Sequence, residues 1–78
     1  MKFEYRDDYI KLGLKISYYR RLNGLTQEQL AEKIGKDISY LGQIEAPNIA
    51  KAISLDTLFD IAKGLGVPAY KFLRFEDD

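Results

Sequence analysis

Apolar residues recur at helical spacing in successive stretches of the chain, and short segments rich in polar residues and glycine separate these stretches. In the first stretch, Leu12, Ile16 and Tyr19 lie four and three residues apart, which places them on one face of a helix. This helix is predicted to run to about Leu22, because the Asn-Gly pair that follows it is a stop signal.

The residues before this helix allow two interpretations. Phe3 and Tyr5 alternate with polar neighbours within residues 1–6, which predicts either a short extended arm or a frayed end. Asp7 or Asp8 is expected to cap the helix, since a carboxylate can accept hydrogen bonds from its first free N–H groups.

The stretch from Thr26 to Glu45 predicts a helix-turn-helix. Thr26 and Gln29 have the spacing of a capping box, and Gly35 can adopt the positive φ that ends a helix. Asp37 is expected to cap the second helix. The predicted buried positions of the two helices are Leu30, Ala31, Ile34, Leu41 and Ile44. The second helix then turns Ile38, Ser39, Gly42 and Gln43 outward, in a shape suited to the major groove.

Two further helices are expected after the motif. Pro47 disfavours helix at Ala46 and starts a loop, and Ser54 is expected to cap a fourth helix that runs through Gly64. Its predicted apolar face comprises Leu55, Leu58, Ile61, Ala62 and Leu65. Pro68 suits the first position of a short fifth helix that would seal the core with Phe72 and Leu73. The prediction is an all-α domain, residues 1–78, built as a compact bundle of five helices.

Composition excludes several kinds of chemistry. The chain has no cysteine and no histidine, so disulfides, thiolate or zinc sites and histidine-based catalysis are ruled out. We expect no enzyme activity, no cofactor and no metal. No apolar run reaches the length of a membrane span and no signal peptide opens the chain, so we expect a cytoplasmic protein.

The net charge of zero is unusual for a protein that binds nucleic acid, but the charges are unevenly distributed. Acidic residues gather at the two ends, at Glu4, Asp7, Asp8 and residues 76–78. Residues 9–75 therefore carry ten basic and six acidic side chains, a net charge of +4. A field this weak predicts strong salt sensitivity and dependence on dimerisation for affinity.

The run Thr-Gln-Glu-Gln-Leu-Ala-Glu-Lys-Ile-Gly from Thr26, followed by Ser-Tyr-Leu and Ile-Glu, resembles the Cro/repressor-type (Xre-like) helix-turn-helix family. That family includes lambdoid phage repressors and restriction–modification controller proteins. Similar blocks precede and follow the motif, so the resemblance covers roughly residues 12–73. It implies a lambda-repressor-like fold and a transcriptional regulator that binds double-stranded DNA, as a homodimer on a palindromic operator.

The resemblance also implies roles for individual residues. Gln27 matches a position that hydrogen-bonds a DNA phosphate, and its place at a helix N-terminus suits an anion. Ile38, Ser39 and Gln43 match positions that face base edges, where glutamine can read adenine and an aliphatic group can contact a thymine methyl. Ile38 has an alternative role at the edge of the core. Gly42 departs from the polar residue that is usual at its position.

Other side chains around the motif are candidates for positioning contacts. Lys36, Asn48 and Lys51 flank the second helix and are expected to grip phosphates. The Tyr40 phenol can reach a phosphate or pack on the neighbouring helix. Arg20 and Glu45 match a pair that forms a buried salt bridge in the family.

The C-terminal segment holds more apolar surface than a fifth helix needs, at Tyr70, Phe72, Leu73 and Phe75. We expect Tyr70 and Phe75 to form a dimer interface, with simple closure of the core as the alternative. An antitoxin-like protein-interaction module that keeps the helix-turn-helix is the alternative function, favoured by the near-zero charge, Gly42 and the absence of arginine from the second helix of the motif. We expect no membrane partner, and the sequence indicates no small-molecule effector.

Overall fold

The computed structural model describes residues 2–75, in which four α-helices and two short 3-10 helices follow one another. In chain order they are η1 (Phe3–Tyr5), α1 (Arg6–Leu22), α2 (Gln27–Ile34), α3 (Ile38–Glu45), α4 (Leu55–Leu65) and η2 (Ala69–Leu73). Within this part of the chain there is no β-strand, which confirms the all-α prediction. The prediction of five helices was wrong, because the last element is a 3-10 turn.

The start of the chain differs from both predictions. Phe3–Tyr5 forms a 3-10 turn that leads directly into α1, so it is neither an extended arm nor a frayed end. The backbone N–H groups of Tyr5 and Arg6 donate to the carbonyls of Lys2 and Phe3, and no side chain caps α1. Asp7 and Asp8 therefore lie within the first turn and are not caps. Their charges still favour the positive end of the helix dipole.

The boundaries of α2 and α3 follow the local signals in the sequence. The Thr26 hydroxyl accepts a hydrogen bond from Gln29 N–H at 3.1 Å, and the Gln29 side chain accepts from Thr26 N–H at 2.9 Å, which confirms the capping box. Gly35 adopts φ 69° and ends α2. Asp37 caps α3, and extended backbone at Ala46 before Pro47 ends it.

The C-terminal half holds one confirmed cap and two corrections. Ser54 caps α4 as predicted, and α4 continues one residue past Gly64 to Leu65. Leu55, predicted on the buried face, is 63% exposed because it opens the first turn of α4 on the outer side. Leu73 is 51% exposed, whereas Phe72 is fully buried, so only Phe72 seals the core.

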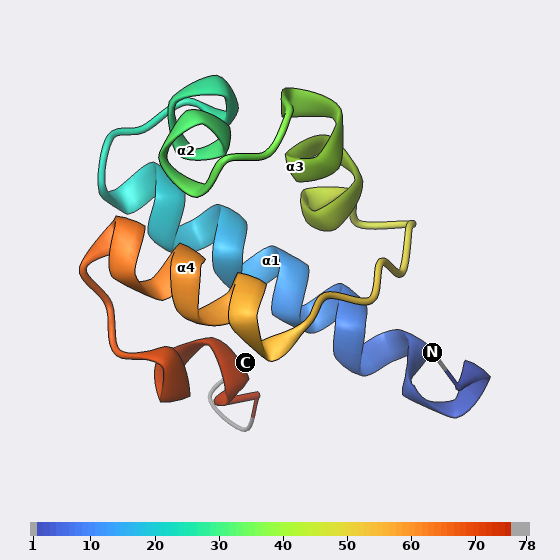
Figure 1. Cartoon of the computed structure of the whole chain (residues 1–78). Coiled ribbons are helices and arrows are strands. Elements are labelled where there is room, and N and C mark those ends of the chain that lie inside the picture. Colours follow the sequence, from blue (N-terminus) through green and yellow to red (C-terminus); the bar gives the residue numbers. More distant parts are fainter. Residues whose placement is uncertain (1, 76–78) are drawn as a thin grey trace.

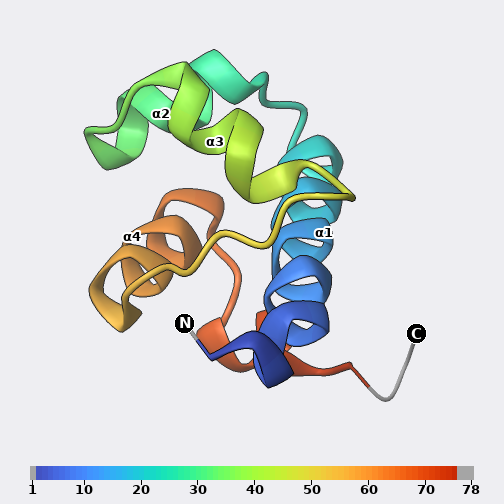
Figure 2. The same ribbon diagram turned by 90° about the vertical axis from the view of Figure 1, so that its right-hand side faces the viewer.

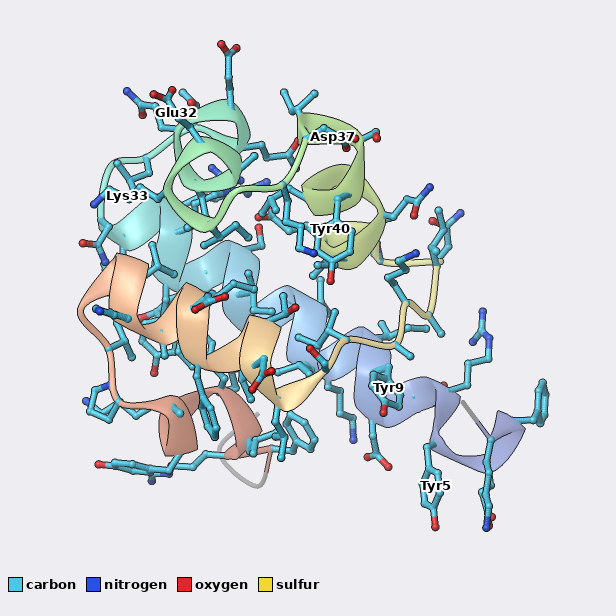
Figure 3. All side chains as sticks on the ribbon, viewed as in Figure 1. Tyr5, Tyr9, Glu32, Lys33, Asp37 and Tyr40 are labelled. Atoms are coloured by element: carbon cyan, nitrogen blue, oxygen red, sulfur yellow. The ribbon has the colours of Figure 1, made fainter. Side chains whose placement is uncertain are left out.

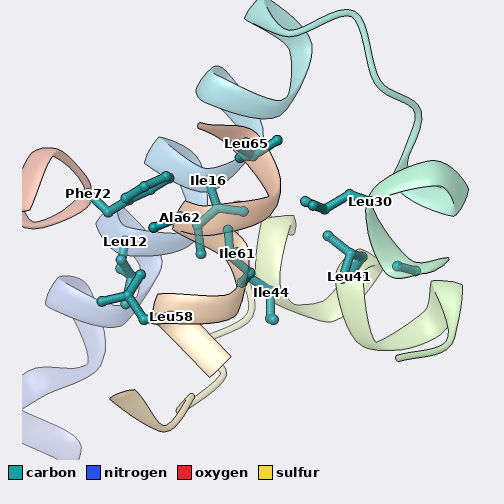
Figure 4. Packing of buried hydrophobic residues seen from close by; sticks show 11 residues of the cluster. Leu12, Ile16, Leu30, Leu41, Ile44, Leu58, Ile61, Ala62, Leu65 and Phe72 are labelled. Atoms are coloured by element: carbon teal, nitrogen blue, oxygen red, sulfur yellow. The ribbon is translucent and has the colours of Figure 1, made fainter. Parts of the chain in front are cut away.

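Figures 1 and 2 show α1 as a long rod that contacts α3, α4 and η2, while α2 packs on α3 and α4. Eleven buried apolar side chains from α1, α2, α3, α4 and η2 form one core, drawn in Figure 4. Tyr19, partly buried, meets Phe72 edge to face with ring centroids 5.2 Å apart.

The packing of α1 on α3 is unusually close at one point. A Cβ added to Gly13 would overlap the backbone carbonyl oxygen of Ile44, so the backbones approach too closely for any side chain at position 13. The absence of a side chain at Gly13 is therefore what allows α1 and α3 to pack this closely. Among the helices of residues 2–75, none is long and apolar enough to cross a membrane.

Candidate nucleic-acid interface

The outer face of α3 presents the side chains that the sequence assigned to base contacts. Leu41 and Ile44 are buried, and this fixes the rotation of the helix about its axis. Ile38, Ser39 and Gln43 consequently point outward and are exposed, with Ile38 at 51%. Gly42 is half-buried on the same side. Three exposed side chains on one face of a short helix form a surface of a size that a major groove admits.

Asp37 organises the first turn of α3 (Figure 3). Its carboxylate accepts a hydrogen bond from the Ser39 hydroxyl at 2.7 Å and from Tyr40 N–H at 3.1 Å. The Ser39 hydroxyl and then the Tyr40 N–H lower the pKa of Asp37, since both donate to its charged form. The Ser39 hydroxyl therefore holds its proton toward Asp37 and presents lone pairs that can accept a hydrogen bond from a base amino group.

Arg20 and Glu45 form a bidentate ion pair that is almost fully shielded from water. Arg20 Nε donates to Glu45 Oε2 and Arg20 Nη2 donates to Glu45 Oε1, both at 2.8 Å. Arg20 Nη1 donates to the backbone carbonyl of Leu25 at 2.6 Å. The guanidinium thus joins α1, the loop before α2 and the last turn of α3.

Gln27 belongs to the same network, a contact that sequence reasoning missed. Its side-chain Nε2 donates to Glu45 Oε1 at 3.1 Å, and the side chain is half-buried. One carboxylate therefore positions both Arg20 and Gln27. Gln27 and Glu45 are 18 residues apart, and only the fold shows that they meet.

Three predicted phosphate-contacting residues come together beside α3. The Lys36 and Lys51 ammonium groups lie 5.2 Å and 5.6 Å from the centroid of the Tyr40 ring. Tyr40 is half-buried and packs against the core. Packing and a phosphate contact are therefore compatible, because a tyrosine can bury its ring and keep its hydroxyl at the surface.

Asn48 is exposed in the loop after α3, and its backbone carbonyl accepts a hydrogen bond from Arg6 Nη2 at 3.5 Å. Arg6 was not among the predicted residues. It adds a positive charge beside this loop and lies 3.7 Å from the carboxylate of Asp7. Nothing in the local sequence indicated the contact, because the partners are 42 residues apart.

The two residues predicted for a dimer interface lie in different surroundings. Tyr70 is exposed on η2, whereas Phe75 is half-buried and lines a groove between α1, α4 and the C-terminal segment. The same groove includes Leu55 and Leu73, both of which expose apolar surface. Phe59 on α4 is a further exposed aromatic residue that the sequence analysis did not select.

The two short helices are joined by a turn, and the second helix buries an apolar face and exposes the opposite one. This arrangement defines the class of helix-turn-helix proteins. The chain belongs to the helix-turn-helix family (HTH_3), whose model matches residues 16–72. The family resemblance identified in the sequence is thereby confirmed, and the chain is a sequence-specific DNA-binding transcriptional regulator.

Relatives and solved structures agree with this assignment. The chain is 39% identical over 64 residues to the uncharacterized HTH-type transcriptional regulator MJ0272 of Methanocaldococcus jannaschii, covering 82% of this chain and 94% of that protein. It is 37% identical over 62 residues to the control protein C.SmaI of Serratia marcescens, covering 80% and 71%. The crystal structure of the restriction-modification controller protein C.AhdI from Aeromonas hydrophila matches with TM-score 0.81 and 29% identity over 88% of this chain and 97% of that one.

Proposed function

We propose that α3 reads base edges in the major groove through Gln43, with Ile38 and Ser39 beside it. The observation that carries the proposal is the rotation of α3, which buries Leu41 and Ile44 and leaves these three side chains exposed on one face. A glutamine amide can bond adenine N6 and N7 together, and an aliphatic side chain can contact a thymine methyl. The operator therefore contains an A·T pair opposite Gln43 in each half-site.

We further propose that Gln27, Lys36, Tyr40, Asn48 and Lys51 contact phosphates on either side of this groove. The positions of these residues support the proposed contacts. Gln27 lies at the start of α2, and Lys36 and Lys51 lie close to the Tyr40 ring on α3. Such contacts fix the register of the protein on the duplex but carry no sequence information.

The active form that we propose is a homodimer on a roughly palindromic operator. A single α3 of eight residues contacts few base pairs, and the described residues carry only a modest positive charge. One copy of the chain is therefore expected to bind DNA weakly. Two copies related by a two-fold axis would place their α3 helices in successive major grooves about 34 Å apart. We propose that the protein acts by binding alone and catalyses no reaction.

The experiment that tests base reading is selection of bound sites from a random duplex library, followed by the matched variants Gln43→Ala and Gln27→Ala. Gln43→Ala is expected to lose about 1–3 kcal/mol on the selected site and little on random DNA. Gln27→Ala is expected to weaken both kinds of duplex by similar factors and to leave the preferred sequence unchanged.

Equal weakening of all duplexes by Gln43→Ala would show that α3 does not read bases. The alternative function, an antitoxin-like module whose main partner is a protein, would then be favoured. Gly42 supports this alternative, since it contributes no side chain to the groove. A salt titration on random duplex separates the two, because a protein that neutralises several phosphates must show a steep slope of log affinity against log salt.

A further inference from the structure

Helix α1 carries an apolar ridge that no other part of the described chain covers. Leu14, Tyr18 and Leu22 lie four residues apart, on one face of the helix, and are 45%, 58% and 69% exposed. Open hollows lie on both sides of Tyr18, one shared with Tyr19 and the other with Leu22. We call these three residues the α1 ridge. Three large side chains exposed in a row are more than the scattered apolar residues of an ordinary surface.

The α1 ridge faces away from the DNA-reading helix. Gly13 touches the backbone of α3, and Arg20 pairs with Glu45 at its end, so these two residues mark the side of α1 that meets α3. Successive residues of an α-helix are about 100° apart, which places Tyr18 roughly opposite both of them. A duplex bound along α3 would therefore leave the ridge accessible.

The charged side chains that α1 itself contributes beside the ridge are all basic. From Lys11 to Leu22, α1 holds four basic residues and no acidic one. Arg20 is neutralised by Glu45, and Lys11 and Arg21 each line one of the two hollows beside Tyr18. Apolar side chains bordered by cations on both sides complement a surface with the same apolar stripe bordered by carboxylates.

We propose that the α1 ridge docks an acidic amphipathic helix of a partner protein while α3 is on DNA. The partner's leucine-like side chains would fill the hollows beside Tyr18, and its carboxylates would pair with Lys11 and Arg21. A second copy of this chain fits worse, because a two-fold contact through the ridge sets its lysines and arginine against their own counterparts. A second duplex also fits worse, since phosphates gain nothing from the apolar centre of the ridge.

The test uses two synthetic helical peptides of one length, each with leucines on one face. The acidic probe carries glutamates on its other face, and the basic probe carries lysines at the same positions. Binding to the full chain, free and on operator duplex, is followed by fluorescence anisotropy of labelled probe. We expect the acidic probe to bind both forms and the basic probe to bind neither. Tyr18→Ser and Leu14→Ser should each weaken the acidic probe about tenfold or more, the loss expected when a large apolar side chain is removed from a buried contact.

Two further variants keep the test independent of folding. Arg21→Gln should weaken the acidic probe several-fold and reduce its salt dependence, and Phe3→Ser, which removes an exposed aromatic outside the ridge, should leave it unchanged. The proposal would be overturned if the two probes bound equally well or if the acidic probe did not bind. It would also be overturned if Tyr18→Ser and Leu14→Ser left binding of the acidic probe unchanged. Three further results would also overturn the proposal. The first is a wild-type oligomer that Tyr18→Ser or Leu14→Ser dissociates, and the second is a loss of random-duplex binding in these two variants. The third is acidic-probe binding that is seen only after residues 76–78 are removed.

Discussion

The guanidinium of Arg20 and the carboxylate of Glu45 meet in two parallel hydrogen bonds of 2.8 Å, across 25 residues of chain. Both side chains are buried, and Gln27 adds a third hydrogen bond to the same carboxylate. The contact therefore fixes the end of α3 relative to α1 and orients a residue proposed to hold a phosphate. Its main effect is geometric, because a buried pair gains little net stability over apolar residues.

Removal of one partner leaves the other charge buried and without compensation, so Arg20→Ala and Glu45→Ala should each cost about 3–5 kcal/mol of unfolding free energy. The double variant should cost much less than the sum of the two. Equilibrium denaturant unfolding of the four proteins measures both quantities. Strict additivity would show that the two residues do not interact.

The close approach of α1 and α3 gives a second stability prediction. Gly13→Ala places a methyl group where the Ile44 carbonyl oxygen lies, so the backbone of α1 or of α3 must shift. We expect a loss of about 1–3 kcal/mol in denaturant unfolding, the usual range for an overpacked core.

Gly42→Ala is the matched control for Gly13→Ala. Position 42 also lies in a helix, but the nearest atom to an added Cβ is Gln27 Oε1 at 4.0 Å, an ordinary contact. The higher helix propensity of alanine should therefore stabilise the protein by up to about 1 kcal/mol. If the two alanine variants behaved alike, the helices would not approach as closely as described.

Asp37 makes the start of α3 sensitive to acid. Hydrogen bonds from Ser39 and Tyr40 lower its pKa from the usual 3.8 in the folded protein. Because the folded-state pKa is the lower one, this stabilisation is fully present above pH 4 or so and is lost as the pH falls through the folded-state value. Asp37→Asn should keep a helix cap and lose the acid dependence.

Thermal unfolding of both proteins between about pH 2 and pH 6 checks this, since that range spans the ordinary aspartate pKa. Other carboxylates titrate in the same range, so the informative quantity is the difference between the wild-type and Asp37→Asn curves. The difference should change only at the acid end. A constant difference over the whole range would mean that the Asp37 charge does not contribute to the cap.

The cluster around Tyr40 predicts how binding responds to salt. Lys36→Gln and Lys51→Gln should each reduce the slope of log affinity against log salt by about 0.9, the value for one lost phosphate contact on B-DNA. Tyr40→Phe keeps the ring beside the two lysines and removes only the hydroxyl, so it should weaken binding without changing the slope. Lys63→Gln, an exposed lysine on α4, is the control and should change neither. An unchanged slope in both Lys36→Gln and Lys51→Gln would remove them from the DNA surface.

Local signals in the sequence predicted the caps and ends of the motif helices, because the groups involved lie within four residues of one another. Thr26 with Gln29, Gly35, Asp37 and Ser54 all act as expected. Sequence also predicted the outward face of α3, since two buried residues fix the rotation of so short a helix.

Features that depend on distant parts of the chain were not predictable from local pattern. Leu55 fits the apolar stripe of α4, but it opens the helix at the edge of the bundle and stays exposed to water. Leu73 follows a fully buried Phe72, and the 3-10 form of η2 turns it outward. The contacts of Gln27 with Glu45 and of Arg6 with Asn48 required the fold, because nothing in the separate segments indicates that they meet.

The last prediction concerns the proposed homodimer. Tyr70 exposes an aromatic ring on η2, and Phe75 lines an apolar groove with Leu55 and Leu73. Paired with a second copy, these side chains would leave water, which is the main favourable term in association. The double variant Tyr70→Ser, Phe75→Ser should therefore sediment as a monomer at micromolar concentration, where we expect the wild type to sediment as a dimer.

The same double variant should bind a single half-site duplex as the wild type does but lose most of its affinity for the full palindrome, because the second half-site no longer benefits from linkage. Leu55→Ser, Phe59→Ser tests whether the interface extends along α4. If only that pair produced monomer, the interface would lie on α4 and not on the C-terminal segment. A wild type that is already monomeric at these concentrations, on and off the operator, would refute the homodimer itself, and recognition of a palindrome would then require another source of cooperativity.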